Sequence, residues 1–476
     1  MEQPLAELVR RWLGPVVAFV AASFAVICVV SVPDVIREAD ELAVLDPRFT
    51  GWVGVSGLVA LGVAAAGLST LDSLGAGPSV ALGAAAAAFG LALARGVASQ
   101  TQCVLALLVL GVAVGALVAA GICITLELPG GWSRVTLMAW GLPVLSGWAV
   151  ATWVALHVPA GVKIRLAPHP SVWLVVAMAV LLAGWAVLTM LVEPPRVRDN
   201  DRIEGVRAKL HRDQWSGDQW AGAWAALVAV VVLAGLVVVS LGFEPGIALS
   251  WLRPVVVVAT GGAVIGLLVV SVLVPVAKAR AGYLTAVAVM LCVPTCVQLL
   301  VTVADAGTSR VSLSAVAVLV AAGWLGALTG WWRSSRGPVL GLLVVALSAI
   351  GGWVMPAAPL WLVLACGSML FGFGTALFAA LRLSNVSSVG IRFTALGLLS
   401  AILVGLVAQV PLSWALIGSL PADPVSARSA GRVFLGLTFA LAVLVAAYAS
   451  VLIGRTNGNG TTRPPGRRWR RRATVR

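Results

Sequence analysis

Three polar side chains stand inside long apolar segments of the sequence, where a polar group needs a hydrogen-bond partner. Gln298 and Thr295 lie in one such segment and Gln409 lies in another. Because lipid offers no hydrogen-bonding partner, each must bond either to another helix or to a molecule held in a cavity. Gln298, Gln409 and Thr295 are candidates for lining a central cavity and bonding a substrate there. Bonding between neighbouring helices is the other explanation, and the more usual one for such residues.

The sequence contains none of the motifs that mark common enzyme centres. It has no G-x-x-x-x-G-K-[ST] phosphate loop, no H-E-x-x-H zinc helix and no G-x-S-x-G nucleophile elbow. All six cysteines lie in apolar segments, so we interpret them as small packing residues and not as a disulfide or zinc framework. The sequence therefore predicts a protein that is not an enzyme and that binds no metal or cofactor.

The composition places these segments in a membrane. Hydrophobic residues make up 60% of the 476 residues and charged residues 11%, whereas about a quarter of an ordinary soluble chain is charged. A transmembrane helix takes about 20 apolar residues. We predict an all-α polytopic membrane protein with fourteen spans at 13–32, 51–71, 78–94, 103–124, 135–157, 171–192, 221–242, 254–277, 283–304, 312–332, 338–355, 359–381, 394–419 and 433–453.

The distribution of the 32 Lys and Arg residues predicts the orientation. Most of them fall in alternate connections and in the tail 455–476, so the positive-inside rule puts both termini in the cytoplasm. Arg greatly outnumbers Lys, as is usual in high-GC bacteria, and we expect a bacterial cytoplasmic membrane. We expect the tail to be disordered and drawn to the anionic lipids of the inner leaflet. Nucleic-acid binding by the tail is the alternative, which we do not expect.

The segment 33–49 between the first two predicted spans is acidic. It contains five Asp and Glu residues against two Arg residues. We expect a solvated loop. The alternative is an amphipathic extension of the first helix, forming an acidic lip that attracts cationic solutes.

Short matches between the two ends of the chain indicate an internal repeat. Gly77-Pro78 pairs with Gly337-Pro338, Gly115 pairs with Gly374, and Arg134 pairs with Arg392, all at nearly the same separation. Secondary transporters are commonly built from such duplicated halves, although chance similarity among Ala- and Val-rich helices is the alternative.

The repeat predicts that the spans group as six, two and six. The expected parts are an N-terminal six-helix bundle at 1–192, a charged cytoplasmic loop at 193–220, two inserted helices with a basic turn at 221–282, a C-terminal six-helix bundle at 283–454, and the tail at 455–476.

Several short segments of the sequence resemble motifs of the major facilitator superfamily, and the grouping of the predicted spans resembles that of its 14-helix drug:proton antiporter subgroup. Ser31-Val32-Pro33-Asp34-Val35-Ile36 stands where the family has a proline phrase at the end of helix 1, and Trp52-Val53 follows. Asp72 and Gly75 keep part of the loop motif between helices 2 and 3. Arg134 and Trp140-Gly141 match an Arg and a Trp-Gly pair before helix 5.

The resemblance suggests roles for several of these residues. Asp72 with Gly75 and Arg134 would form a cytoplasmic gate, because a carboxylate there can accept hydrogen bonds from a helix N-terminus or pair with an Arg in one state only. A solvated loop acid is the alternative for Asp72. Trp140 would join the cavity lining. Small residues and a proline would let helices pack closely and bend: Gly111, Gly115, Gly141, Pro143, Gly147, Gly372 and Gly374.

Two departures from the subgroup concern the energy source. The helix 1 acid falls on Phe24, and the helix 4 Arg is missing from the apolar stretch Leu105 to Leu110. An ionisable group within a span usually takes part in the binding of ions or substrate. Because the helix 1 acid and the helix 4 Arg are both absent, we do not expect these positions to couple transport to protons.

These features predict an alternating-access transporter that exports a hydrophobic small molecule or a lipid-like compound. A transporter-derived protein that no longer cycles, serving as a scaffold or sensor in a cell-envelope pathway, is the first alternative. A polytopic lipid-modifying transferase is the second.

Overall fold

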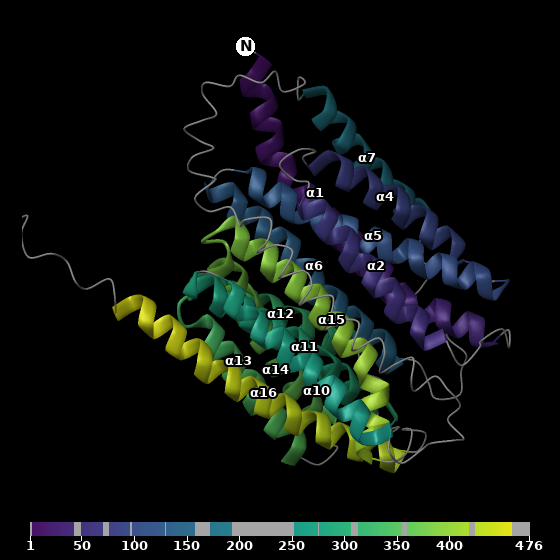
Figure 1. The fold of residues 1–476 in the computed structure, drawn as a ribbon, viewed down its shortest axis with the longest axis vertical. Helices are drawn as coiled ribbons and strands as arrows, with labels where there is room; N and C mark the ends of the chain where they lie inside the picture. Colours follow the sequence, from purple (N-terminus) through teal and green to yellow (C-terminus); the bar gives the residue numbers. More distant parts are fainter. Residues whose placement is uncertain are drawn as a thin grey trace, which may run out of the picture.

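The computed structural model describes residues 2–41, 49–69, 76–95, 98–128, 130–157, 172–192, 252–274, 276–305, 313–354, 359–417 and 424–458. This part of the chain is helical, with thirteen α-helices, one short 3-10 helix and no strand (Figure 1). The elements are α1 (Glu2–Glu41), α2 (Phe49–Ser69), α4 (Ala76–Leu93), α5 (Gln100–Glu127), α6 (Gly130–His157), α7 (Val172–Val192), α10 (Leu252–Val270), η1 (Ser271–Leu273), α11 (Ala277–Asp305), α12 (Leu313–Trp332), α13 (Gly337–Val354), α14 (Pro359–Ser384), α15 (Ser388–Ile417) and α16 (Pro424–Gly458).

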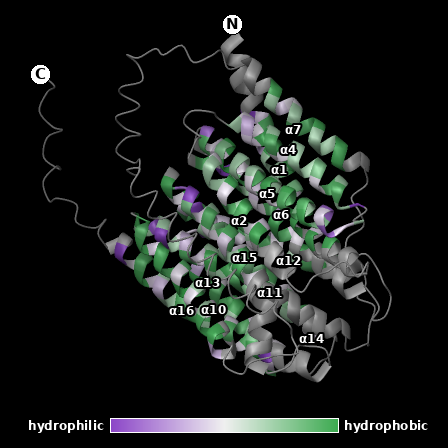
Figure 2. Cartoon of the chain, turned by 45° about the vertical axis from the view of Figure 1, so that its right-hand side comes forward, coloured by the Kyte–Doolittle hydropathy of each residue, from purple (hydrophilic) through white to green (hydrophobic). Residues whose placement is uncertain are grey.

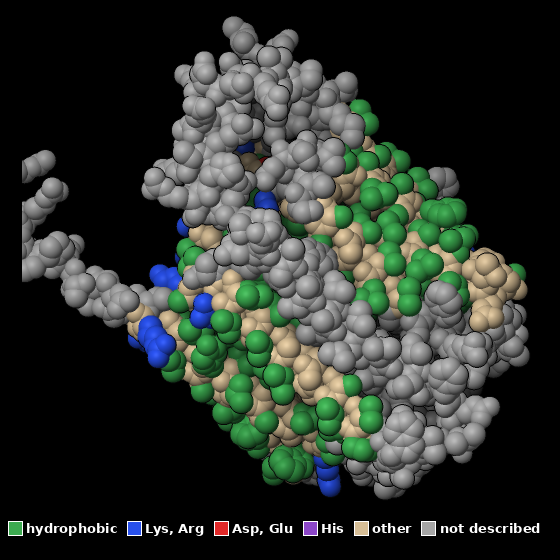
Figure 3. All heavy atoms as spheres, in the orientation of Figure 1, with side chains coloured by type: hydrophobic (Ala, Val, Ile, Leu, Met, Phe, Trp, Pro, Cys, Tyr) green, Lys and Arg blue, Asp and Glu red, His purple; other side chains and the backbone are tan. Residues whose placement is uncertain are grey.

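The surface of these helices is apolar, as a bilayer requires. Hydrophobic residues run along the described helices (Figure 2), and hydrophobic side chains cover much of the described surface in Figure 3. Large apolar residues such as Val354, Val258 and Leu347 are 68 to 74% exposed. Within the described residues, six helices are long and apolar enough to cross a membrane, and five shorter apolar helices accompany them. The chain is therefore a multi-pass membrane protein.

The described helices agree with thirteen of the fourteen predicted spans, and the span predicted at 221–242 lies outside the described residues. Two helices run beyond their predicted spans. The first helix continues to Glu41, so the acidic segment begins as a helical extension and not as a loop. The last helix likewise runs to Gly458, into the predicted tail, while residues 459–476 lie outside the described part.

Six helices form a first set, comprising α1, α2, α4, α5, α6 and α7. Within it α5 is central and contacts α1, α2, α4 and α6, while α7 contacts α4 and α1. A second set, comprising α11 to α16, repeats these contacts in the same order: α14 is central and contacts α11, α12, α13 and α15, while α16 contacts α13 and α11. The two sets are thus built on one packing plan.

The contacts between the sets follow a two-fold relation. Helix α6 of the first set contacts α12 and α14, and helix α15 of the second set contacts the corresponding α2 and α5. Helix α6 also contacts α11, and this contact has no equally extensive counterpart between α15 and α1. Figure 1 shows α6, in blue, and α15, in light green, in the middle of the view, between the other helices of the first set above and those of the second set below. These helices form two seams, α6 with α12 and α2 with α15.

Helix α10 belongs physically to the second set, because it packs on α15 and is bonded to α11. The Tyr283 hydroxyl of α11 is buried and donates to the carbonyl of Leu267 at 3.0 Å. The guanidinium of Arg280 donates to the carbonyls of Val272 and Val274. These carbonyls lie at the end of α10 and η1, where a helix leaves acceptors without intrahelical partners.

We expect Tyr283→Phe to weaken this attachment. The change leaves the Leu267 carbonyl without the hydroxyl, so stability should fall by about 1 kcal/mol. Thermal unfolding of the full chain in lipid nanodiscs measures the shift. Tyr448 is half-exposed on α16, so Tyr448→Phe is the matched control and should leave the transition unchanged. Equal shifts in both variants would contradict the assignment.

Candidate substrate site between the two helix sets

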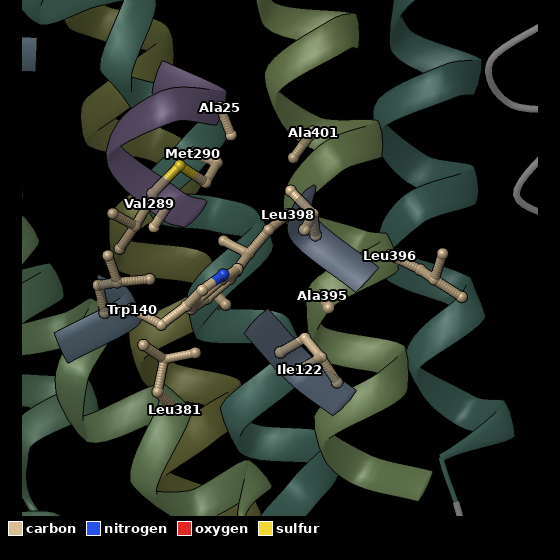
Figure 4. Packing of buried hydrophobic residues seen from close by; sticks show 14 of the residues in the cluster. Ala25, Ile122, Trp140, Val289, Met290, Leu381, Ala395, Leu396, Leu398 and Ala401 are labelled. Carbon is tan, nitrogen blue, oxygen red and sulfur yellow. The ribbon is translucent and has the colours of Figure 1, made fainter. Parts of the chain in front are cut away.

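The two sets meet around the side chain of Trp140 on α6. Trp140 is 5% exposed, and its ring lies among apolar residues of both sets (Figure 4). We call this group the Trp140 cluster. Its members from the first set are Ala25, Ile122 and Trp140, and those from the second set are Val289, Met290, Leu381, Ala395, Leu398 and Ala401. The cluster joins α1, α5 and α6 to α11, α14 and α15.

Small residues on α5 and α6 make room for this contact. Gly121 of α5 lies under the indole ring, since a Cβ there would collide with the ring of Trp140. Gly141 faces the second set, where a Cβ would come within 2.9 Å of Phe378 and 3.2 Å of Leu381. Pro143 is buried inside α6 and removes one backbone donor from the helix ladder. The sequence of α6 is therefore adapted to close approach at the seam.

Glycines also hold each set together in matching ways. A Cβ on Gly115 of α5 would meet the carbonyl of Ala60 on α2 and the amide of Ala64. A Cβ on Gly374 of α14 would meet the carbonyl of Gly323 and the amide of Ala327 on α12. Both glycines thus contact a carbonyl and the amide four residues later on the corresponding helix.

The other predicted packing glycines lie at similar close contacts. Gly111 faces the carbonyl of Ser56, and Gly372 faces the carbonyl of Gly341 and the side chain of Val345. Gly147 faces Val26 on α1.

The two seams are joined by different chemistry. Across the α6 and α12 seam, the indole N–H of Trp324 donates to the hydroxyl of Ser146 at 2.9 Å. Across the α2 and α15 seam, the side chain of Leu403 enters the notch left by Gly57. Ser146 and Trp324 are partly exposed, whereas the Trp140 cluster between the seams is buried.

The structure places the sequence-predicted site residues in three groups. Asp72 and Gly75 lie outside the described residues, and the side chains of Gln298 and Gln409 are not described, although their helices are. Arg134 is exposed on the second turn of α6. The buried Thr295 hydroxyl accepts a hydrogen bond of 2.8 Å from Thr438 on α16, which is the helix-to-helix bonding that the sequence left open; its role in a cavity stays a prediction.

A carboxylate other than Asp72 is found at the helix end next to the predicted gate. The Glu127 side chain at the end of α5 accepts a hydrogen bond of 3.0 Å from the amide of Ala76, the first residue of α4. An acidic group at a helix N-terminus is favoured by the unsatisfied amides and the helix dipole. Sequence reasoning assigned this chemistry to Asp72 and missed Glu127.

Sequence reasoning also missed Ser146, Trp324 and Met290. A signal existed for Trp324, because it lies well inside the predicted span 312–332, whereas interfacial tryptophans gather at span ends. Within the described residues, no group of three or more His, Cys, Asp or Glu side chains could hold a metal ion.

The comparisons with known proteins concern the fold. A POT family transporter in complex with a thioalcohol-conjugated peptide superposes with a TM-score of 0.52 at 11% identity, over 92% of this chain and 96% of that one. The nucleoside transporter NupG gives a TM-score of 0.51 at 13% identity, over 92% and 98%. Tetrameric PepTSo2 gives 0.51 at 17% identity, over 94% and 99%.

The chain has the fold of these solved transporters. This agrees with the predicted all-helical fold class and with a transporter-like fold; the antiporter subgroup and the grouping of fourteen spans as six, two and six stay predictions. No family model matches the sequence, and no curated protein matches it. At these identities the likeness concerns the fold, and the roles of individual residues rest on the contacts described above.

Proposed function

We propose that the protein is a membrane transporter that works by alternating access. The observation that carries this proposal is the Trp140 cluster, where two sets of the same packing plan meet through apolar side chains and glycine notches. Such contacts can separate without breaking buried ion pairs, so the sets can rock about them at low cost. The likeness to solved transporters supports the same reading through the fold.

The proposed cargo is a hydrophobic small molecule or a lipid-like compound. The Trp140 cluster presents aliphatic groups, a thioether and an indole, and ligand sites of this lining favour apolar molecules with few polar groups. Outward movement is the proposed direction, which rests on the resemblance to antiporters. We also propose the bacterial cytoplasmic membrane, with both termini inside, on the basis of the Lys and Arg distribution.

The test is untargeted metabolite and lipid profiling of a deletion strain complemented with the wild-type chain or with Asp72→Asn. We expect one class of apolar compound to accumulate in the deletion strain and to fall when the wild-type chain is restored. Because Asp72 is the proposed gate, the level of that compound should remain high in the strain complemented with Asp72→Asn. An unchanged profile, together with no movement of hydrophobic dyes in vesicles, would reject transport and favour the scaffold or sensor alternative.

We predict that transport does not depend on a proton gradient. Phe24 takes the place of the antiporter acid in α1 and is fully buried. A phenyl ring carries no proton, so this position cannot couple proton entry to cargo exit. A protonophore added to vesicles that contain the full chain should leave the initial downhill rate of dye movement unchanged. A rate that collapses with the protonophore would show that another group carries the proton.

A further inference from the structure

Two tryptophans in the described part of the chain bury an indole N–H that has no hydrogen-bond acceptor. They are Trp140, which is 5% exposed, and Trp185, which is 6% exposed. Trp324 differs, because its N–H bonds to Ser146. Buried donors in native proteins are nearly always paired, and an exception marks either strain or a functional site. The location of each donor decides between these explanations.

The N–H edge of Trp140 lies against the backbone of α5. A Cβ on Gly121 would collide with both Cδ1 and Nε1 of the indole, so this edge of the ring occupies the space that a side chain would take. The nearby carbonyl of Gly121 accepts the hydroxyl of Thr125 at 2.8 Å. The ring therefore packs well, while its donor is left without an acceptor.

Trp140 and Trp185 differ in what opening of the transporter would do to them. Trp140 lies among Met290, Leu381 and Leu398 of the second set (Figure 4), so separation of the two sets uncovers its ring. Trp185 lies on α7, which contacts α4 and α1 of its own set, and separation of the sets leaves that packing in place. Of the two unpaired donors, only that of Trp140 belongs to a ring that borders the second set, so it is the one that a molecule between the sets can approach.

We propose that the indole N–H of Trp140 binds the cargo through a hydrogen bond. The cargo is then an apolar molecule that carries a hydrogen-bond acceptor, such as a carbonyl or ether oxygen. Apolar surroundings make a single paired donor selective, because an analogue without the acceptor leaves the N–H unsatisfied while the rest of its binding is unchanged. This inference rests on the proposed transport function and names the chemistry of its cargo.

The test compares two probes of nearly the same size and shape. 2-Acetylnaphthalene carries a ketone acceptor, and 2-ethylnaphthalene does not. Saturable binding of each radiolabelled probe is measured on the full chain in lipid nanodiscs, with empty nanodiscs subtracted. Trp140 is replaced by 3-benzothienylalanine, which keeps the bicyclic shape and exchanges the N–H for sulfur. The same replacement at Trp185 is the matched control.

The wild-type chain should bind the ketone about tenfold more tightly than the hydrocarbon, as expected for one hydrogen bond in an apolar site. The replacement at Trp140 should abolish this preference and leave hydrocarbon binding unchanged, while the replacement at Trp185 should preserve it. Equal binding of both probes by the wild-type chain, saturable binding of neither, or a preference that survives the Trp140 replacement would overturn the inference. A binding preference in a chain that moves nothing across vesicles would reject the transport function and leave the binding site standing.

Discussion

Cysteines placed at Gly57 and Leu403 will form a disulfide that fixes the two helix sets together and stops transport. A Cβ on Gly57 would lie 3.0 Å from Cγ of Leu403. One further bond separates that Cγ from the Cβ of Leu403, so the two Cβ atoms lie within about 4.5 Å, the range found in disulfides. The bond would join α2 to α15 across a seam that must change if the sets rock.

The cross-link is measured on a chain with a protease site inserted into the segment 193–212. Protease cleavage separates the two sets on a reducing gel, and the disulfide of G57C/L403C should keep them joined without reductant. Dye movement in vesicles should fall to background after oxidation and return after reduction. Gly62 has no atom within 4 Å of an added Cβ, so G62C/L403C is the control that should not cross-link. A fully cross-linked chain that still transports would contradict rocking at this seam.

Valine at Gly115 or at Gly374 will prevent each set from assembling, and the two losses will be of similar size. The colliding atoms are backbone atoms of α2 and α12, which cannot move aside as a flexible side chain can. Overpacking of this kind typically costs about 1 to 3 kcal/mol, and a collision with backbone lies at the upper end. The yield of folded, monodisperse protein in detergent should fall steeply for both variants.

The control for these substitutions is Gly62→Val on α2, a position with open space around an added Cβ. Its folded yield should match the wild type, since valine is no worse than glycine in a helix interior. A steep loss in only one of Gly115→Val and Gly374→Val would show that the two positions are not equivalent. A loss at Gly62 as large as at Gly115 would place the effect in the substitution itself and not in the contact.

The sequence patterns predicted the helices and some of the positions that are equivalent in the two sets. The match of Gly115 with Gly374 was inferred from sequence spacing alone, and both residues contact corresponding backbone atoms in their sets. The same reasoning left two explanations open for Thr295. An isolated polar residue in an apolar helix has the same appearance in a sequence whether it faces a cavity or a neighbouring helix, and the packing of α11 on α16 directs Thr295 to Thr438.

The acidic segment after the first span shows a second limit of pattern reasoning. Hydropathy marks where the lipid core ends, and the acidic residues that follow suggested a solvated loop from that point on. Backbone hydrogen bonding does not stop at that boundary, and α1 continues to Glu41. Helix length and span length are therefore separate quantities in this chain.

The sequence by itself determined that this protein is a bundle of transmembrane helices, because lipid leaves the backbone few other ways to satisfy its hydrogen bonds. Spacing of small residues further determined where helices could approach. Only the tertiary structure decided which residues meet between the two sets. Trp140, Gly57 and Leu403 are brought to their partners from distant helices. Those contacts depend on helix rotation and crossing, which a one-dimensional pattern of apolar residues does not specify.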